Sequence, residues 1–182
     1  ALPKTNCKEF LRPYLAEAVA SVCGDDVELC AVCVAKGMEF LNAPYETIQK
    51  VTEDLVRSDG ERYCFSKSQE EVDTLLWEAQ LKYVFPLVEN YRRYFVKKYY
   101  AFIKAALPIN NGYGDQVMVP EEAELGNLMY LVERGGIPVS AEESMELKRY
   151  RKARNELAHM NLLSNEELCV ILKAGKHKTA SD

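Results

Sequence analysis

The longest patterned stretch of the sequence runs from Ser68 to Leu107, and its apolar side chains recur every three or four positions. That spacing places the apolar groups along one side of an α-helix. Ser68 is followed three residues later by Glu71, which is the pattern of a helix N-terminal capping box. Pro86 interrupts the stretch, so we predict either a kink there or two consecutive helices.

The same helical spacing continues on both sides of this stretch. Before it we predict three helices: Phe10 to about Gly24, Asp25 or Asp26 to about Leu41, and Tyr45 to about Arg57. After it we predict three more: one opened by Pro120 and closed by Gly135-Gly136, one capped by Ser140 with Glu143, and a short one from Ser164 with Glu167 to about Lys173. The predicted fold class is therefore all-α.

Turn-forming residues divide this helical pattern into parts. We take residues 58–67 as a junction, in which the short segment 62–65 can be extended, and residues 108–114 as a loop. The predicted organisation is an acidic N-terminal helical region over 1–62, which can pack on the main bundle, a main helical domain over 63–175, and a frayed tail over 176–182.

Aromatic and apolar residues of the long helical stretch are assigned first to the core. The spacing predicts a core stripe of Val88, Tyr91, Phe95, Tyr99 and Phe102, and Trp77 is also expected in the core. Aromatic rings interleaved with Lys and Arg can stack nucleic-acid bases, but here the helical spacing favours packing.

The net charge of −5 argues against a general polyanion binder, yet the charge is unevenly distributed. Residues 1–60 carry six basic and ten acidic side chains. In contrast, residues 89–104 and residues 145–155 each carry five basic side chains and one acidic side chain. Two local basic segments on an acidic protein are candidates for contact with an anionic ligand.

The chain contains six cysteines and no obvious targeting segment. We expect reduced, mostly buried thiols, with an extracellular disulfide-bonded module as the weaker alternative. Cys30 and Cys33 share a helix face, but no second Cys/His pair completes a zinc site, so we predict no metal or cofactor. No apolar run is long enough to cross a membrane, and the first residues lack a signal-peptide layout, so we expect a cytoplasmic protein.

The segment Arg154-Asn155-Glu156-Leu157-Ala158-His159 carries the clearest chemistry, in a chain with only two histidines. Residues four apart share a helix face, so Arg151, Asn155 and His159 lie along one stripe, and the long side chain of Arg154 can reach it from beside. Arg can stabilise negative charge and His can move a proton near neutral pH. This set is suited to a phosphodiester.

The segment from Tyr150 to His159, followed by Leu163-Ser164-Asn165-Glu166-Glu167, resembles the signature of HEPN domains. In that family four to six residues separate an Arg, often followed by Asn, from a His, and this chain has four. The segment from Phe85 to Arg93 is similar to the first helix of the family, in which an acid precedes basic residues. The resemblance covers about residues 68–174 and implies an all-α bundle of HEPN-like type, commonly dimeric.

Many HEPN domains are metal-independent endoribonucleases of toxin, antiphage or CRISPR-associated systems, and others are inactive binding modules. The resemblance therefore implies cleavage of single-stranded RNA by 2′-hydroxyl attack, with Arg154, Asn155 and His159 catalytic. The residues implied to guide RNA are Arg92, Arg93, Lys97, Lys148 and Arg151, with Glu89 supporting. A homodimer is expected, with an antitoxin or effector as a further partner. The alternative is a non-catalytic helical module that binds a nucleotide, RNA or a protein.

Overall fold

A computed structural model describes residues 5–110 and 116–178, and these residues are predominantly helical. Its helices are α1 (Arg12–Cys23), α2 (Val27–Lys36), α3 (Met38–Asn42), α4 (Pro44–Asp54), α5 (Gln69–Lys98), α6 (Tyr100–Ala105), α7 (Leu125–Glu133), α8 (Ala141–Ala158) and α9 (Asn165–Lys178). Two short 3-10 helices, η1 (Glu9–Leu11) and η2 (Pro120–Glu122), and two short strands, β1 (Ile109–Asn110) and β2 (Gln116–Val117), complete the described elements. The all-α prediction is confirmed.

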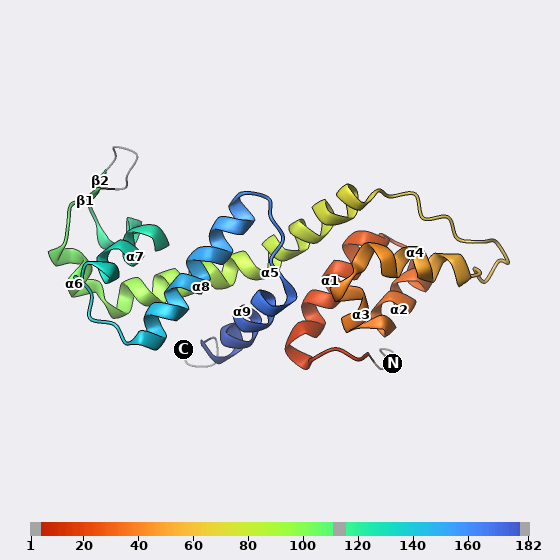
Figure 1. Ribbon diagram of the computed structural model, residues 1–182, viewed down its shortest axis with the longest axis horizontal. Helices are drawn as coiled ribbons and strands as arrows, with labels where there is room; N and C mark the ends of the chain where they lie inside the picture. The colour runs from red at the N-terminus through yellow and green to blue at the C-terminus, as the bar shows by residue number, and fades with distance from the viewer. Residues whose placement is uncertain (1–4, 111–115, 179–182) are drawn as a thin grey trace.

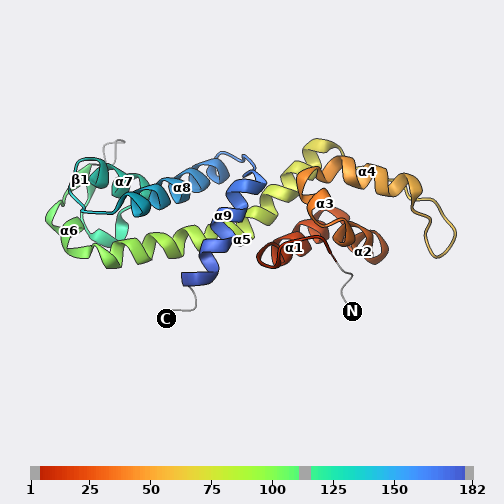
Figure 2. The same cartoon turned by 60° about the horizontal axis from the view of Figure 1, so that its bottom comes forward.

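Helix α5 extends along the long axis of the molecule, and α1, α4, α8 and α9 pack directly against it (Figure 1). Helices α1 to α4 lie around its N-terminal half, while α7 and α8 lie along its C-terminal half, and both views agree on this arrangement (Figure 2). Helix α9 contacts α5, α8 and η1, so it connects the N-terminal part of the fold to α8. The buried side chains of all these parts form one connected core.

The long helix continues through Pro86, so the prediction of two helices meeting there is wrong. A proline removes one N–H and frees the carbonyl four residues earlier, which here belongs to Lys82. Both Pro86 and Lys82 are exposed, and water can therefore satisfy that carbonyl. The break comes instead at Tyr99, whose φ of −108° and ψ of 22° separate α5 from α6.

This break changes which side chains reach the core. Val88, Tyr91, Phe95 and Tyr99 are buried as predicted. Phe102, predicted to extend the same stripe, is 47% exposed, and its neighbour Ile103 is fully buried instead. The buried series therefore continues at a four-residue spacing from Tyr99 to Ile103, and Phe102, three residues after Tyr99, turns outward. Trp77 is half-buried at the edge of the core.

The predicted capping boxes at Ser68, Ser140 and Ser164 are confirmed, since each serine oxygen accepts the N–H three residues later. Three other boundaries differ from the sequence prediction. The second predicted helix divides at Gly37, which has a φ of +56°, and the third ends at Asp54. Pro120 opens only η2, and α7 begins five residues later.

The remaining predicted segments are partly described. The 58–67 junction begins in a turn, and one antiparallel bridge joins Arg62 of the junction to Val56 before it. The predicted 108–114 loop lies in an antiparallel hairpin with Ile109 opposite Val117, and residues 111–115 lie outside the described residues. Helix α9 extends to Lys178, beyond the predicted end near Lys173, whereas 179–182 of the predicted frayed tail lie outside the described residues.

Candidate functional site

Helix α8 carries the predicted site residues, and its C-terminal end is closed by a turn of specific geometry. His159 is the C-cap residue, and Met160 has a left-handed φ of 62°. The N–H of Asn161 donates to the Glu156 carbonyl at 2.9 Å, and the N–H of Met160 donates to the Leu157 carbonyl at 3.2 Å. These bonds satisfy carbonyls at the helix end, as in a Schellman-type cap, and fix the backbone beside His159.

A cleft of about 630 Å³ lies where α8 faces α7, η2 and the β hairpin. Three predicted site residues from α8, namely Arg151, Arg154 and Asn155, line this cleft together. Their positions, i, i+3 and i+4, place them on neighbouring parts of one helix face, which explains their convergence. The structure therefore brings two guanidinium groups and one amide to a single opening.

The polar side chains of this set are exposed and uncommitted. Within residues 5–110 and 116–178, neither Arg151 nor Arg154 forms an ion pair or a side-chain hydrogen bond. Lys152, on the same helix, is in contrast paired with Glu167 at 2.6 Å, which raises the pKa of the lysine. A guanidinium without a protein carboxylate partner is available for an anionic ligand.

His159 does not line this cleft. It lies one helical turn beyond Asn155, at the exposed end of α8, and its imidazole forms no hydrogen bond within the described part of the chain. The adjacent Leu157 carbonyl accepts a hydrogen bond from Trp77 Nε1 at 2.9 Å, which attaches this end of α8 to α5. The backbone beside His159 is therefore fixed, while its side chain is exposed.

The predicted basic residues of α5 have different surroundings. Arg92 binds Glu89 through two contacts, at 2.6 and 2.9 Å, and also donates to the carbonyls of Glu121 (2.7 Å) and Ala123 (3.1 Å). Only 15% of its side chain is exposed. Arg92 thus holds the backbone of η2, which forms one wall of the cleft, and its hydrogen bond keeps the pKa of Glu89 low.

The other predicted RNA-guiding residues remain at the surface. Arg93 pairs with the same carboxylate, with its Nε 3.1 Å from Glu89 Oε1. Lys97 and Lys148 are exposed and form no ion pair among the described residues. None of these three lines the cleft. Their role in guiding RNA stays a prediction. Of the predicted basic residues, only Arg151 and Arg154 line the cleft.

Sequence reasoning missed the opposite wall of the cleft. Tyr130 and Asn127 from α7, and Glu122 and Glu124 at and after η2, line it together with the arginines. These residues lie about 25 positions before the α8 set and belong to no recognised motif. The sequence signal for this wall is a tyrosine within the apolar run Leu128 to Val132, and that signal is weak without the three-dimensional arrangement.

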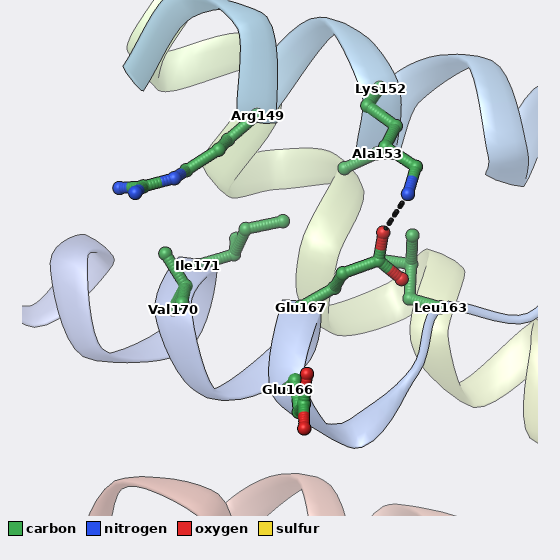
Figure 3. Close-up of a pocket in the computed structure, with 8 residues that line it drawn as sticks. All are labelled: Arg149, Lys152, Ala153, Leu163, Glu166, Glu167, Val170 and Ile171. Carbon is green, nitrogen blue, oxygen red and sulfur yellow. Dashed lines mark ion pairs between the residues drawn. The ribbon is translucent and has the colours of Figure 1, made fainter. Parts of the chain in front are cut away.

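A smaller hollow of about 170 Å³ lies on another side of α8, between α8 and α9 (Figure 3). Val170 and Ile171 form its apolar floor, the Lys152–Glu167 ion pair lies at one side, and the guanidinium of Arg149 lies at the other. With one of its two cations neutralised and a mainly apolar lining, this hollow is less suited to a phosphodiester than the α7/α8 cleft.

Comparison of the chain with protein-family models, curated proteins and solved structures gave no match in any of the three. Within the described residues, no group of three or more His, Cys, Asp or Glu side chains is placed to hold a metal ion. No described helix combines the length and apolar character that a membrane crossing needs. All six cysteines have free thiols.

Proposed function

We propose that this protein is a HEPN-type endoribonuclease that cleaves single-stranded RNA without a metal ion and acts as a homodimer, as a toxin or defence effector with an antitoxin or effector partner. The observation that carries the proposal is the set of uncommitted polar side chains on α8. Arg151, Arg154 and Asn155 line one cleft, and His159 follows one turn later on the same helix. The resemblance of this segment to the HEPN signature gives the chemistry.

In the proposed reaction, the guanidinium of Arg154 binds the scissile phosphate and stabilises the charge that develops on its oxygens. Arg151 supplies a second positive charge along the same strand of RNA. The 2′-oxygen attacks phosphorus and loses its proton, and the bond from phosphorus to the 5′-oxygen breaks as that oxygen gains a proton. The products are a 2′,3′-cyclic phosphate and a 5′-hydroxyl end.

His159 carries one of the two proton transfers, and Asn155 orients the imidazole or contacts the phosphate. Because His159 lies outside the cleft of its own chain, the proposed homodimer provides the remaining geometry. Two α8 helices facing each other across a two-fold axis would place the cleft of one copy near the imidazole of the other. The basic residues Lys97 and Lys148 would guide the RNA by charge alone.

The test is cleavage of a 5′-labelled single-stranded RNA in EDTA, with analysis of the product ends. Wild-type protein is expected to produce cyclic phosphate ends, and His159→Ala is expected to cleave about 10²- to 10⁴-fold more slowly, which is the usual contribution of a general acid or base. His177→Ala removes the only other histidine and should cleave like wild type. Equal rates for wild type and His159→Ala would exclude the role assigned to His159.

A second candidate function is a non-catalytic HEPN-like module that binds RNA, a nucleotide or a protein. The position of His159 outside the cleft favours this candidate, because binding through Arg151 and Arg154 does not need the imidazole. It predicts no RNA cleavage by wild-type protein under any of these conditions, together with RNA binding that depends on Arg154 and is indifferent to His159.

A further inference from the structure

Tyr130 is the one aromatic side chain among the described residues that line the α7/α8 cleft. It is 43% exposed, and the guanidinium carbon of Arg134 lies 4.6 Å from its ring centroid. Most tyrosines of this chain that pack in the core are under 10% exposed, as Tyr91 and Tyr150 are. A half-exposed tyrosine in the wall of a cleft that also holds two arginines has the geometry of a stacking surface for a nucleic-acid base.

We propose that the cleft is a single-nucleotide subsite for RNA, in which Tyr130 stacks the base while Arg151 and Arg154 bind the adjacent phosphodiester. This inference rests on the proposed function and adds to it the base-binding residues. The cleft volume of about 630 Å³ lies within the range of about 300–1,000 Å³ that is usual for small-ligand sites. One nucleotide, rather than a longer segment, therefore fits inside.

The charges that line the cleft limit the kind of phosphate it accepts. Arg151 and Arg154 contribute two positive charges, and Glu122 and Glu124 contribute two negative charges. A nucleoside triphosphate would bring three or four negative charges into a cleft whose own charges cancel, whereas a phosphodiester brings one. The balance favours an internal nucleotide of RNA over a free polyphosphate nucleotide.

The two carboxylates also distinguish among bases. A carboxylate accepts hydrogen bonds only, so it pairs with a base edge that presents N–H donors. The exocyclic amines of cytosine, adenine and guanine meet this requirement, and Glu accepting from the cytosine amine is a standard pairing in nucleic-acid recognition. Uracil has carbonyl oxygens at its exocyclic positions and only its ring N3–H as a donor. The subsite is therefore expected to prefer bases with an exocyclic amine, such as cytosine and adenine, over uracil.

The experiment measures binding of fluorescent 2′-O-methyl octamers, which cannot be cleaved by 2′-hydroxyl attack. Wild-type protein is expected to bind oligo-C and oligo-A more tightly than oligo-U, by about 5-fold or more. Tyr130→Ala is expected to weaken binding by about 5- to 150-fold, the range measured for loss of one stacked base, while Tyr130→Phe retains wild-type affinity. Tyr100→Ala removes another exposed tyrosine, outside the cleft, and should have no effect.

Two further measurements test the role of the carboxylates and the preference for a phosphodiester over a triphosphate. The double variant Glu122→Gln/Glu124→Gln should bind oligo-U more nearly as well as oligo-C, because a glutamine amide can also donate to the uracil carbonyl. Glu121→Gln is the control, because Glu121 does not line the cleft, and it should keep the wild-type preference. ATP and CTP in excess should compete poorly with the octamers. Competition as strong as that of an unlabelled octamer would overturn the charge argument.

The outcomes distinguish this inference from the proposed function. If binding depends on Arg154 but Tyr130→Ala binds like wild type, the base subsite is wrong and RNA binding by α8 stands. If wild-type protein binds none of the octamers, both the subsite and the proposed function are wrong.

Discussion

Gln80 makes a set of buried hydrogen bonds that joins three distant parts of the chain. Its side chain is only 3% exposed. Its Oε1 accepts from the N–H of Leu163 at 2.8 Å, and its Nε2 donates to the carbonyl of Leu163 at 3.1 Å and to the hydroxyl of Tyr14 at 3.3 Å. One amide thus holds the α8–α9 connection against both α5 and α1.

Gln80→Leu is expected to lower the free energy of unfolding by about 2–5 kcal/mol. Leucine is close to glutamine in size, so the cost comes from lost hydrogen bonds rather than from a cavity. The N–H and C=O of Leu163 both lose their side-chain partner while buried, and each such group costs about 1–3 kcal/mol. The loss is a large part of the 5–15 kcal/mol that is typical for a folded domain.

The measurement is equilibrium unfolding in urea, with the slope m checked for constancy between variants. Gln49→Leu is the matched control, because the amide of Gln49 also donates to a tyrosine hydroxyl, that of Tyr45 at 2.9 Å, but at the surface. The control should change the free energy of unfolding by about 0.5 kcal/mol or less. A Gln80→Leu effect below about 1 kcal/mol, or equal to that of the control, would refute the reasoning.

Two more predictions concern stability. The ammonium of Lys98 is the main cause that lowers the pKa of Glu143 to about 2. This carboxylate therefore stabilises the fold fully above its unfolded pKa of about 4.3. Its contribution is lost as the pH falls toward 2. Urea midpoints between pH 6 and pH 2.5 should therefore fall less steeply for Glu143→Gln than for wild type, and parallel curves would contradict the assignment. Gly37→Ala should lower the free energy of unfolding in urea by about 1–3 kcal/mol more than Gly24→Ala does. Both glycines have a positive φ, +56° and +64°, but only a Cβ on Gly37 would meet another atom, Thr5 Oγ1 at 2.6 Å, whereas Gly24 faces open space. Equal losses would show that the close contact does not matter.

The sequence predicted the helices well where a local signal set their ends. Ser68 and Ser140 each begin a helix because the serine and the glutamate three residues later satisfy the first N–H groups without help from the rest of the fold. Pro86 left open a kink or two consecutive helices, because its effect depends on solvent exposure, which is not a local property, and the structure excludes only the second. The end of α5 at Tyr99 carries no Gly or Pro, so no local signal marked it.

The candidate site was predictable in part for the same reason. Helical spacing alone places Arg151 and Asn155 on one face, and the structure brings both to the cleft with Arg154. The Tyr130 wall depends on how α7 packs against α8, and no spacing within one helix contains that information. Helical spacing also predicted His159 on that face, but His159 is the C-cap residue of α8 and does not line the cleft.

The central claim is that the cleft face of α8 is the phosphodiester site, and one pair of variants tests it most directly. Arg154 lines the cleft, while Arg149 is equally exposed on another side of the same helix. The measurement is the rate of single-stranded RNA cleavage in EDTA, at one protein concentration, for wild type, Arg154→Ala and Arg149→Ala. The claim predicts that Arg154→Ala loses at least about 100-fold and that Arg149→Ala stays within about twofold of wild type. Equal rates for the two variants would contradict it.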